Sequence, residues 1–365
     1  MTTTFTVARS DLRRTQWLEA PAVPLEAGAA RMRIDRFALT SNNITYGAFG
    51  HTMNYWSFFP TGDEATGCIP VWGFAAVSES RCSGVEEGER FYGYYPMADE
   101  VVLHPVHIGA SGFIDGAAHR RELHAVYNQY LRCSHDPLYR EPDEALLALL
   151  RPLFTTSFLI DDFLADNGFF GAQTVLVSSA SSKTSYGLGF CLAARRGQPG
   201  AAVSVGLTSA ANLAFTKSLG CYDEVLSYAD VTCLPADSPA VYVDMSGNAA
   251  LRKAIHNRWQ DKLFYSCSVG GMHWEDLGGG KGLPGPRPVL FFAPAQAKKR
   301  ASEWGSAQLQ AQIVATWADF LARVAQPDQP WLKVASNRGR KAVEATYAAL
   351  LDGTVAANEG RILSL

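Results

Sequence analysis

Short apolar runs of strand length alternate with helical stretches between residues 172 and 292, and this alternation is the clearest pattern in the chain. The first run, residues 175–177, passes into small hydroxyl residues and then into a stretch that can continue as a helix. Strands that alternate with helices of about 10 to 15 residues are typical of βαβ units. The pattern predicts an α/β domain built on a doubly wound parallel sheet. Its later strands are expected at residues 202–207, 241–244, 262–269 and 288–292.

The residues after the first predicted strand read S-S-A-S-S-K-T-S, at positions 178–185. In dinucleotide-binding crossovers, a tight turn at this place lets a pyrophosphate approach the amides of a helix N-terminus. Ser179, Ser182 and Ser185 stand at the spacing where such turns usually carry glycine. Serine is small and its hydroxyl can donate to a phosphate, although it adopts positive φ less readily than glycine. The alternative interpretation is an ordinary polar turn in any parallel sheet.

The N-terminal half of the chain has a different pattern. Residues 31–106 form short extended runs broken by Gly and Pro, which is typical of a compact antiparallel β domain. Residues 110–145 are polar and predict a helical insertion, and residues 144–164 predict an apolar helix that is broken or kinked at Pro152. This change of pattern places a domain boundary between residues 142 and 143.

Composition and charge exclude several classes of protein. A chain of 365 residues with 47% hydrophobic residues can form two domains, each with its own core. No apolar run approaches the length of a membrane span, and the first residues lack the apolar core of a secretion signal. A net charge of −3 gives no general attraction to nucleic acid or anionic lipid. Seven cysteines without paired spacing indicate reduced thiols, so we expect a cytoplasmic protein without nucleic-acid or membrane partners.

The order of these segments resembles the medium-chain dehydrogenase/reductase superfamily, and within it the zinc-independent quinone-oxidoreductase and enoyl-reductase branch. The similar segments occur in sequence order along most of the chain. The resemblance implies a GroES-like catalytic domain at residues 1–142, a Rossmann dinucleotide-binding domain at 143–293, and a C-terminal segment, 294–365, that returns to the catalytic domain. The segments that carry the resemblance are residues 37–46, 69–94, 151–160, 214–225 and 348–365.

The chain departs from the zinc-dependent members of this superfamily. Gly73 is followed by Phe74 rather than by the His and Glu of a ligand turn, and no C-x2-C spacing exists. The eight histidines form no ligand spacing either. We therefore expect no metal. Without a Lewis acid to stabilise an alkoxide, the resemblance favours reduction of polarised C=C bonds, in which hydrogen bonds stabilise an enolate.

The end of the second predicted strand indicates the cofactor. NAD selection usually depends on an acidic residue there, which accepts from the ribose 2′-hydroxyl. This chain instead has Thr208 and Ser209, with no carboxylate to repel a 2′-phosphate, so NADPH is preferred over NAD. Lys183 is either a phosphate ligand or a solvated residue of the first helical turn. The resemblance also places late-strand groups of 266–270 and 291–293 near the nicotinamide. The complete set of candidate cofactor residues is Ser179, Ser181, Ser182, Lys183, Thr184, Ser185, Thr208, Ser209, Ser268 and Phe292.

The candidate catalytic residues lie in the segment S-N-N-I-T-Y. In the resembling branch an Asn near this place lies by the nicotinamide, which implies Asn42 or Asn43, and Tyr46 is a candidate proton or hydrogen-bond donor to the substrate. The alternative is a strand end with turn-forming Asn residues and a core tyrosine. Side chains that could shape an apolar acceptor site, or simply pack together, are His51, Tyr55, Trp56, Tyr127 and Thr156.

Together these features predict an NADPH-dependent, zinc-independent reductase of an enoyl or enone-type substrate, acting by hydride transfer. The first alternative is a quinone or aldehyde reductase. The second comes from another class and is a non-catalytic nucleotide-binding or sensor protein with a degenerate cofactor loop. The resemblance also implies a homodimer that associates through edge strands of the nucleotide-binding sheet. The sequence leaves the identity of the small-molecule substrate open.

Overall fold

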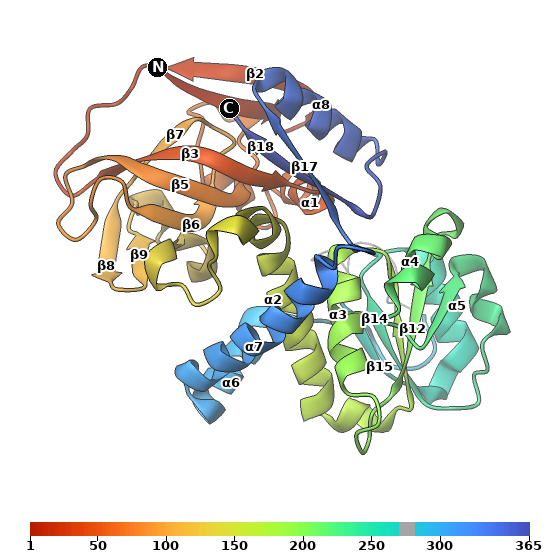
Figure 1. Ribbon diagram of the computed structural model, residues 1–365. Helices are drawn as coiled ribbons and strands as arrows, with labels where there is room; N and C mark the ends of the chain where they lie inside the picture. Colours follow the sequence, from red (N-terminus) through yellow and green to blue (C-terminus); the bar gives the residue numbers. More distant parts are fainter. Residues whose placement is uncertain (270–281) are drawn as a thin grey trace. The chain divides into compact units, whose positions relative to one another are not determined.

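The structure is a computed structural model that describes residues 1–269 and 282–365 (Figure 1). The chain divides into two compact units. We call Met1–Arg151 with Leu332–Leu365 the β unit, and Pro152–Trp331 the α/β unit. The boundaries predicted after residues 142 and 293 therefore lie too early in the chain.

Antiparallel strands build most of the β unit, as the sequence predicts. β1 (Thr2–Ala8) pairs with β2 (Asp11–Ala20) and with β4 (Thr66–Gly67). A larger sheet has the strand order β17-β18-β3-β5-β6-β10-β9-β8, and β7 (Glu100–Leu103) also pairs with β3. The strands of this larger sheet are β3 (Ala30–Leu39), β5 (Val71–Ser80), β6 (Arg90–Tyr95), β8 (Pro105–Gly109), β9 (Gly112–Asp115), β10 (Gln129–Arg132), β17 (Lys333–Arg338) and β18 (Glu359–Ser364).

The C-terminal segment completes this sheet. β18 pairs with β3 on one side and runs parallel to β17 on the other, and α8 (Arg340–Leu351) packs against both β17 and β18. Both chain termini therefore belong to the β unit (Figure 1). The predicted closing helix, turn and strand are present.

The predicted helical insertion at residues 110–145 is wrong. This segment contains β9, β10 and short 3-10 turns, among them η3 (Ala125–Asn128). Long-range contacts explain the difference, since Arg120 is buried and its guanidinium donates to the Phe58 carbonyl at 3.2 Å and to the Tyr130 hydroxyl at 3.0 Å. Arg120 also pairs with Asp115 at 3.2 Å. Tertiary contacts of this kind override helix propensity.

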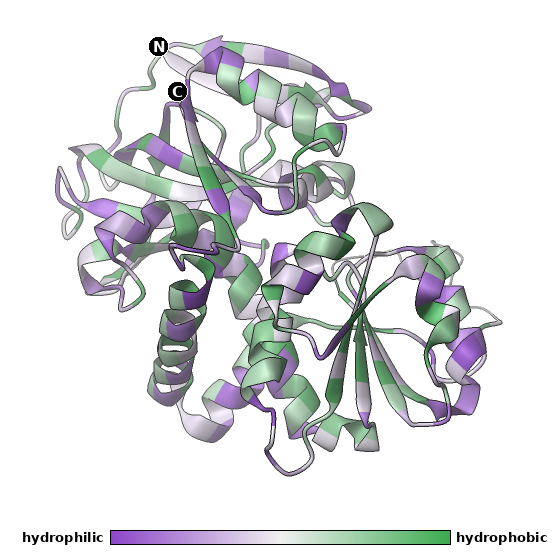
Figure 2. Ribbon diagram, turned by 45° about the vertical axis from the view of Figure 1, so that its right-hand side comes forward, coloured by the Kyte–Doolittle hydropathy of each residue, from purple (hydrophilic) through white to green (hydrophobic). Residues whose placement is uncertain are grey.

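The α/β unit contains the predicted parallel sheet, with the strand order β13-β12-β11-β14-β15-β16. In chain order this is 3-2-1-4-5-6, the order of a dinucleotide-binding Rossmann sheet. In Figure 2 its strands are mainly green, whereas the surrounding helices carry both green and purple residues. The strands are β11 (Thr174–Val177), β12 (Val203–Thr208), β13 (Glu224–Ser227), β14 (Ala240–Asp244), β15 (Leu263–Ser268) and β16 (Val289–Leu290).

The helices are α1 (Ser41–Ala48) in the β unit, α2 (Glu144–Asp166), which runs from the β unit into the α/β unit, and five more in the described α/β unit. α2 continues through Pro152, so the predicted break is not observed. None of the described helices has an apolar stretch that would traverse a bilayer. The five helices of the α/β unit are α3 (Lys183–Ala194), α4 (Leu213–Leu219), α5 (Ala249–Trp259), α6 (Ala293–Trp304) and α7 (Ser306–Val324).

Packing explains why α6 and α7 belong to the α/β unit. The ring of Phe154 in α2 stacks on Phe320 in α7, with centroids 4.3 Å apart, and Tyr186 in α3 also contacts Phe320. Arg300 in α6 pairs with the buried carboxylate of Asp162 in α2 at 2.7 Å. Burial of these rings fixes both helices on α2 and α3. The domain boundary therefore follows these helices at Leu332 instead of preceding them.

A buried histidine ties α5 to the segment before β16. His256 Nδ1 lies 2.9 Å from the Pro284 carbonyl, and Nε2 lies 3.0 Å from the Ser266 hydroxyl. In the neutral ring with its proton on Nδ1, the first nitrogen donates and the second accepts. Burial lowers the pKa of His256, and nearby Arg252 lowers it further, whereas the Pro284 carbonyl and Asp244 oppose these effects.

We expect the free energy of unfolding to fall as the pH drops from about 7 to about 5, in part because of His256. The folded protein holds this ring neutral, whereas an unfolded chain protonates it near the ordinary pKa of about 6.5. The contribution of neutral His256 to the free energy of unfolding is complete above the pKa of the unfolded chain. It is lost as the pH falls from there through the lower pKa of His256 in the folded protein. Urea unfolding at both pH values should show a smaller fall in the free energy of unfolding for His256→Gln than for the wild type. The exposed His104→Gln is the control, and an equal fall in both variants would contradict the assignment.

Candidate active site

The turn between β11 and α3 has the strand–turn–helix form that the sequence predicts. β11 ends at Val177, and α3 begins at Lys183. Within the turn, Ser179 has a φ of 51°, in the left-handed region. Glycine adopts this region without steric cost, whereas serine is strained there. The serine at the place of the first expected glycine thus takes a conformation for which glycine is normally used. Its amide donates to the Tyr228 hydroxyl at 3.2 Å.

Ser182 and Ser185 close this turn onto α3. The Ser182 hydroxyl caps the helix by accepting from the Ser185 amide at 3.3 Å, and it donates to the Ser185 hydroxyl at 2.8 Å. The Ser185 hydroxyl donates in turn to the Ser178 carbonyl at 3.1 Å. These hydroxyls are therefore engaged inside the turn. A phosphate would meet the backbone amides at the helix N-terminus, which have no intrahelical acceptors.

The start of α3 rests on α2. The Ser157 hydroxyl donates to the Leu153 carbonyl at 2.9 Å and to the Thr184 carbonyl at 2.7 Å. Lys183 and Thr184 are the first two residues of α3, and both are half-buried. Thr156 lies on the same helix as Ser157, and its hydroxyl donates to the Pro152 carbonyl at 3.0 Å. Its hydrogen bond is therefore local to α2, whereas Ser157 joins the two helices.

Ser181 and Thr208 connect the turn to the end of β12. Both are buried, and the Thr208 hydroxyl donates to the Ser181 hydroxyl at 3.3 Å. Thr208 thus holds the turn at the end of β12 through this hydrogen bond. Ser209 follows with an extended backbone and is half-buried at the end of the strand. Neither residue is acidic, so no carboxylate stands at the end of β12 itself.

The carboxylate of Asp244 joins the turn to β14, and the sequence prediction missed it. Its Oδ1 accepts from the Ser178 hydroxyl at 3.0 Å, from the Ser246 amide at 3.0 Å and from the Gly247 amide at 3.1 Å. Its Oδ2 forms an ion pair with Arg252 at 2.7 Å, and both side chains are almost fully buried. The Ser178 hydroxyl also accepts from the Met245 amide at 3.0 Å. This network fixes the ends of β11 and β14 relative to each other.

β11 and β14 flank the switch point of the sheet. β11 pairs in parallel with β12 on one side and with β14 on the other. After β11 the chain adds β12 and β13 on the first side, and it then crosses to add β14 on the second side. Ligands of open α/β sheets bind at the carboxyl ends of the strands at such a point. The turn at residues 178–182 lies there. The α/β unit therefore has the geometry of a dinucleotide-binding crossover.

Ser268 and Phe292 come from the later strands. Ser268 is opposite Asp244 in the register of β14 and β15, it is 4% exposed, and its hydroxyl has no partner among the described residues. Its carbonyl accepts from the Phe291 amide at 2.8 Å. Phe292 is half exposed at the start of α6. Gly270, at the end of the predicted 266–270 segment, lies outside the described residues.

In the β unit, the segment predicted as an active-site strand is a helix from Ser41 onward. β3 ends at Leu39, and α1 begins at Ser41 with a capping box. Asn43 is buried, and its Oδ1 accepts from the Thr40 amide at 2.8 Å. Its Nδ2 donates to the Pro70 carbonyl at 2.9 Å. Asn43 therefore starts the helix and ties it to the segment before β5.

Asn42 and Tyr46 form a pair on α1. Asn42 Nδ2 donates to the Tyr46 hydroxyl at 2.8 Å. Tyr46 is 6% exposed, and its ring lies 4.5 Å from that of Tyr55 in η1 (Tyr55–Ser57). Burial raises the pKa of the Tyr46 hydroxyl above its ordinary value, although interactions with Trp72 and Asn42 act in the other direction. Tyr46 thus keeps its proton at neutral pH and remains a hydrogen-bond donor.

The structure brings together only some of the predicted pocket residues. The hydroxyls of Tyr55 and Tyr127 are 3.3 Å apart, although 72 residues separate them in the sequence. Trp56 instead packs over Gly50 and Gly67, where a Cβ on either glycine would overlap the indole. His51 is exposed and lies beside Trp56, with ring centroids 6.4 Å apart.

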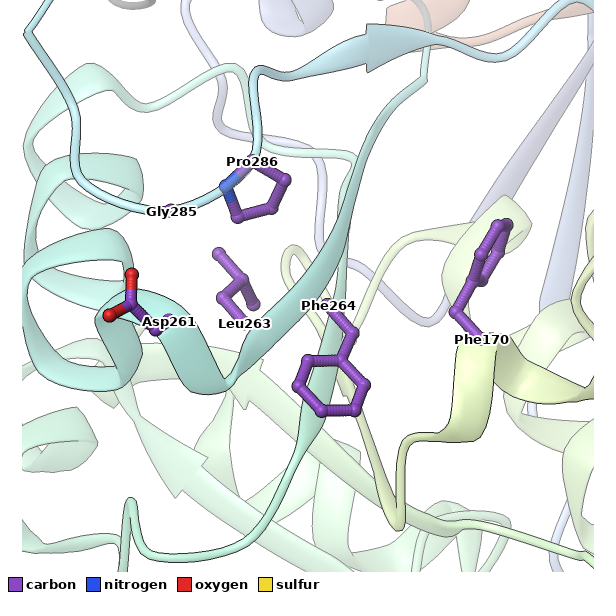
Figure 3. A pocket seen from close by; sticks show the side chains of 6 residues that line it. All are labelled: Phe170, Asp261, Leu263, Phe264, Gly285 and Pro286. Atoms are coloured by element: carbon purple, nitrogen blue, oxygen red, sulfur yellow. The ribbon is translucent and has the colours of Figure 1, made fainter.

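A separate hollow of about 560 Å³ lies at the start of β15 (Figure 3). It is at the opposite end of the strand from Ser268, and none of the predicted site residues lines it. Its lining is mostly apolar, with one carboxylate, and comprises Phe170, Asp261, Leu263, Phe264, Gly285 and Pro286. It is therefore distinct from the crossover turn.

Metal ligands do not gather in the described part of the chain. Among residues 1–269 and 282–365, no group of three or more His, Cys, Asp or Glu side chains could hold a metal ion. Burial raises the pKa of several cysteine thiols, for example that of Cys267 to about 12, so these groups stay protonated at neutral pH. His273, one of the eight histidines, lies outside the described residues.

Comparison with solved structures gives the fold. CurA from Vibrio vulnificus in complex with NADPH is 13% identical, with a TM-score of 0.62 over 100% of this chain and 99% of that chain. CurK enoyl reductase is 10% identical, with a TM-score of 0.55 over 100% and 99%. The quinone oxidoreductase from Coxiella burnetii is 10% identical, with a TM-score of 0.53 over 100% and 99%. No curated protein matches the sequence.

These neighbours share the two-part architecture of a Rossmann sheet and a GroES-like antiparallel β domain. The fold predicted from the order of the sequence segments is thus confirmed. A family profile with the description "Protein of unknown function (DUF2855)" matches residues 37–356. The chain therefore belongs to this DUF2855 family, and its fold is similar to that of the solved CurA, CurK and Coxiella burnetii quinone oxidoreductase structures.

Proposed function

We propose that this protein is an NADPH-dependent, zinc-independent reductase of a polarised C=C bond in a conjugated carbonyl compound. The observation that carries the proposal is the turn between β11 and α3, where Ser179 takes the left-handed conformation at the switch point of the sheet. Such a conformation is costly for serine, and strain of this kind is characteristic of functional sites.

The residues of the turn fit a dinucleotide. Residues 178–182 carry no side chain larger than serine, so a diphosphate can approach the backbone there. The amides of the turn and of the first turn of α3 would hold it, with Lys183 at the helix start. Ser209 is the nearest hydroxyl after β12 for a 2′-phosphate, since Thr208 is engaged with Ser181. The absence of an acidic residue at 208–209 favours NADPH over NAD.

Bound NADPH would supply a hydride to the β-carbon of an enone, and the C=C electron pair would move toward the carbonyl oxygen. A proton added at the α-carbon would complete the reduction. The protein has to stabilise charge on that oxygen and provide the proton. Tyr46 suits the first task because its buried hydroxyl is neutral and is oriented by Asn42. Asn43 is a positioning residue in this proposal, since its amide is occupied by Thr40 and Pro70.

Quinone reduction is the second candidate, and the aromatic residues around Tyr46 favour it. The rings of Tyr46, Tyr55 and Tyr127 form a surface suited to a planar acceptor. The fold similarity to the quinone oxidoreductase from Coxiella burnetii is compatible with this choice. The proposal also includes a cytoplasmic homodimer that associates through the edge strand β16, where Val289 is about half exposed.

Thermal melting with NADPH and with NADH tests the cofactor assignment. A ligand at a hundredfold excess over Kd stabilises the folded state by about 2.7 kcal/mol, so NADPH should raise the melting temperature by several degrees. NADH at the same concentration should raise it less. If neither nucleotide shifts the melting curve, the turn is a degenerate one and the redox proposal is wrong.

Substitutions of Ser179 test whether the turn receives the nucleotide. Ser179→Gly removes strain without adding bulk, so NADPH affinity should stay within about twofold of the wild type. Ser179→Val places a β-branched residue at positive φ beside the diphosphate and should weaken binding by about tenfold or more. Calorimetric titration of both variants gives the affinities. Wild-type affinity in Ser179→Val would place the nucleotide elsewhere.

Tyr46→Phe tests the role of the buried hydroxyl. Turnover of NADPH with 3-penten-2-one or 1,4-benzoquinone should fall by about tenfold or more, because a donor to the developing charge is lost. NADPH affinity should not change. Tyr139→Phe is the matched control, since the Tyr139 hydroxyl donates to Glu144. Unchanged turnover in Tyr46→Phe would remove this residue from the site.

A further inference from the structure

One face of the β5–β6 strand pair is covered by large aromatic side chains. The two strands are antiparallel neighbours (Figure 1). Their register places Trp72 opposite Tyr94 and Phe74 opposite Tyr92. Residues two apart in a strand point to the same face, so all four side chains lie together. The Trp72 ring stacks on Tyr92 at 5.5 Å and lies 4.9 Å from Tyr94.

Three more tyrosines pack on this face from distant parts of the β unit. Tyr46 comes from α1, with its ring 5.7 Å from that of Tyr94. Tyr127 comes from η3 and lies 4.8 Å from Tyr94 and 5.9 Å from Trp72. Tyr55 joins Tyr46 and Tyr127 through ring contacts of 4.5 and 5.9 Å. We call Tyr46, Tyr55, Trp72, Tyr92, Tyr94 and Tyr127 the aromatic cluster.

Several donors of the aromatic cluster are buried without an acceptor. The hydroxyls of Tyr92 and Tyr94 and the indole N–H of Trp72 have no hydrogen-bond partner among the described residues. Other buried tyrosines of the β unit are satisfied, since Tyr95 donates to the Phe91 carbonyl and Tyr130 to the Tyr94 carbonyl. A buried donor without a partner destabilises the fold, because it has lost its hydrogen bonds to water. An acceptor from outside the chain would satisfy three such groups in one cluster.

Two of the unmatched donors, the Trp72 indole N–H and the Tyr94 hydroxyl, lie near the Tyr46 hydroxyl. Trp72 and Tyr94 are close enough to the Tyr46 hydroxyl to act against the rise in its pKa that burial causes, yet neither forms a hydrogen bond of normal geometry with it. An acceptor oxygen near these three groups would receive hydrogen bonds from the Trp72 indole and from both hydroxyls. Burial raises the pKa of Tyr94 as well, so its hydroxyl is also a neutral donor.

We propose that Trp72, Tyr94 and Tyr46 form a donor site for the carbonyl oxygen of a planar, conjugated substrate. This inference rests on the proposed reductase function and assigns its substrate class. The three donors can stabilise negative charge that develops on the substrate oxygen. The surrounding rings can pack against a flat π-system by offset or edge-to-face contact. Trp72 and Tyr94 are thus specificity residues in addition to Tyr46.

Binding of 4-nitrophenol to the nucleotide-free protein tests the donor site. This planar phenol carries an oxygen that becomes negative on ionisation, and the ionised form has its own absorption band. Below the pKa of the free phenol, binding to the wild type should increase that band, because the donors stabilise the anion. Tyr94→Phe and Trp72→Phe should each weaken binding by at least about fivefold, since each loses one charge-assisted hydrogen bond.

Tyr95→Phe is the matched control, because it removes a satisfied hydroxyl from the other face of β6 and should leave 4-nitrophenol binding unchanged. Melting curves establish whether each variant folds. If Tyr94→Phe does not fold, Trp72→Phe provides the test. If 4-nitrophenol fails to bind, or binds equally to both variants, the donors are satisfied by water and the inference is wrong.

The same proteins are also melted with NADPH, which separates the two proposals. An NADPH shift without phenol binding would overturn only the donor site. Phenol binding without any nucleotide shift would overturn the reductase function and leave a binding site for planar phenols or carbonyl compounds.

Discussion

The carboxylate of Asp244 holds together the turn after β11 and the loop after β14. It accepts hydrogen bonds from the Ser178 side chain and from the loop after β14, and it is paired with Arg252 in the interior. Removal of one partner of a buried ion pair typically costs about 3–5 kcal/mol, because the other charge is left uncompensated. The position of the turn after β11 therefore depends on an interaction that is expensive to break.

This constraint explains how serines can occupy the places of glycines. The strained backbone at Ser179 persists only if its surroundings fix it, and Asp244 and Tyr228 hold residues 178 and 179 from two sides. Ser182 and Ser185 then use their hydroxyls to cap α3 and to close the turn. In the proposed function these two serines therefore contribute the shape of the turn, and the helix amides are left for the diphosphate.

In the β unit, a buried arginine and a group of packed aromatic rings fix the segment after β9. The segment after β9 carries Tyr127 onto the aromatic cluster, and Arg120 anchors that segment through Phe58 and Tyr130. Donors without acceptors are then kept in an apolar environment, where hydrogen bonds are stronger than in water. An acceptor oxygen of a bound ligand would use the donors that Trp72, Tyr92 and Tyr94 leave unmatched.

Sequence reasoning predicted the parallel sheet and the turn after β11, because apolar runs and small residues are local signals. It failed at residues 110–145, where the polar stretch is shaped by the buried Arg120 and not by local propensity. It also missed Asp244, since 66 residues separate it from Ser178 and the pair is evident only once β11 and β14 are neighbours. Asn43 was identified, but its bond to the Pro70 carbonyl, which ties α1 to the segment before β5, is one that no local pattern indicates.

The central claim is that the turn after β11 receives a diphosphate although it lacks glycine. A crystal structure of the protein with NADPH tests it most directly. The account predicts a diphosphate against the backbone of residues 179–182 and the N-terminal amides of α3, with Asp244 still bonded to Ser178. A nucleotide bound elsewhere, or a turn whose side chains fill the space for the phosphates, would contradict it.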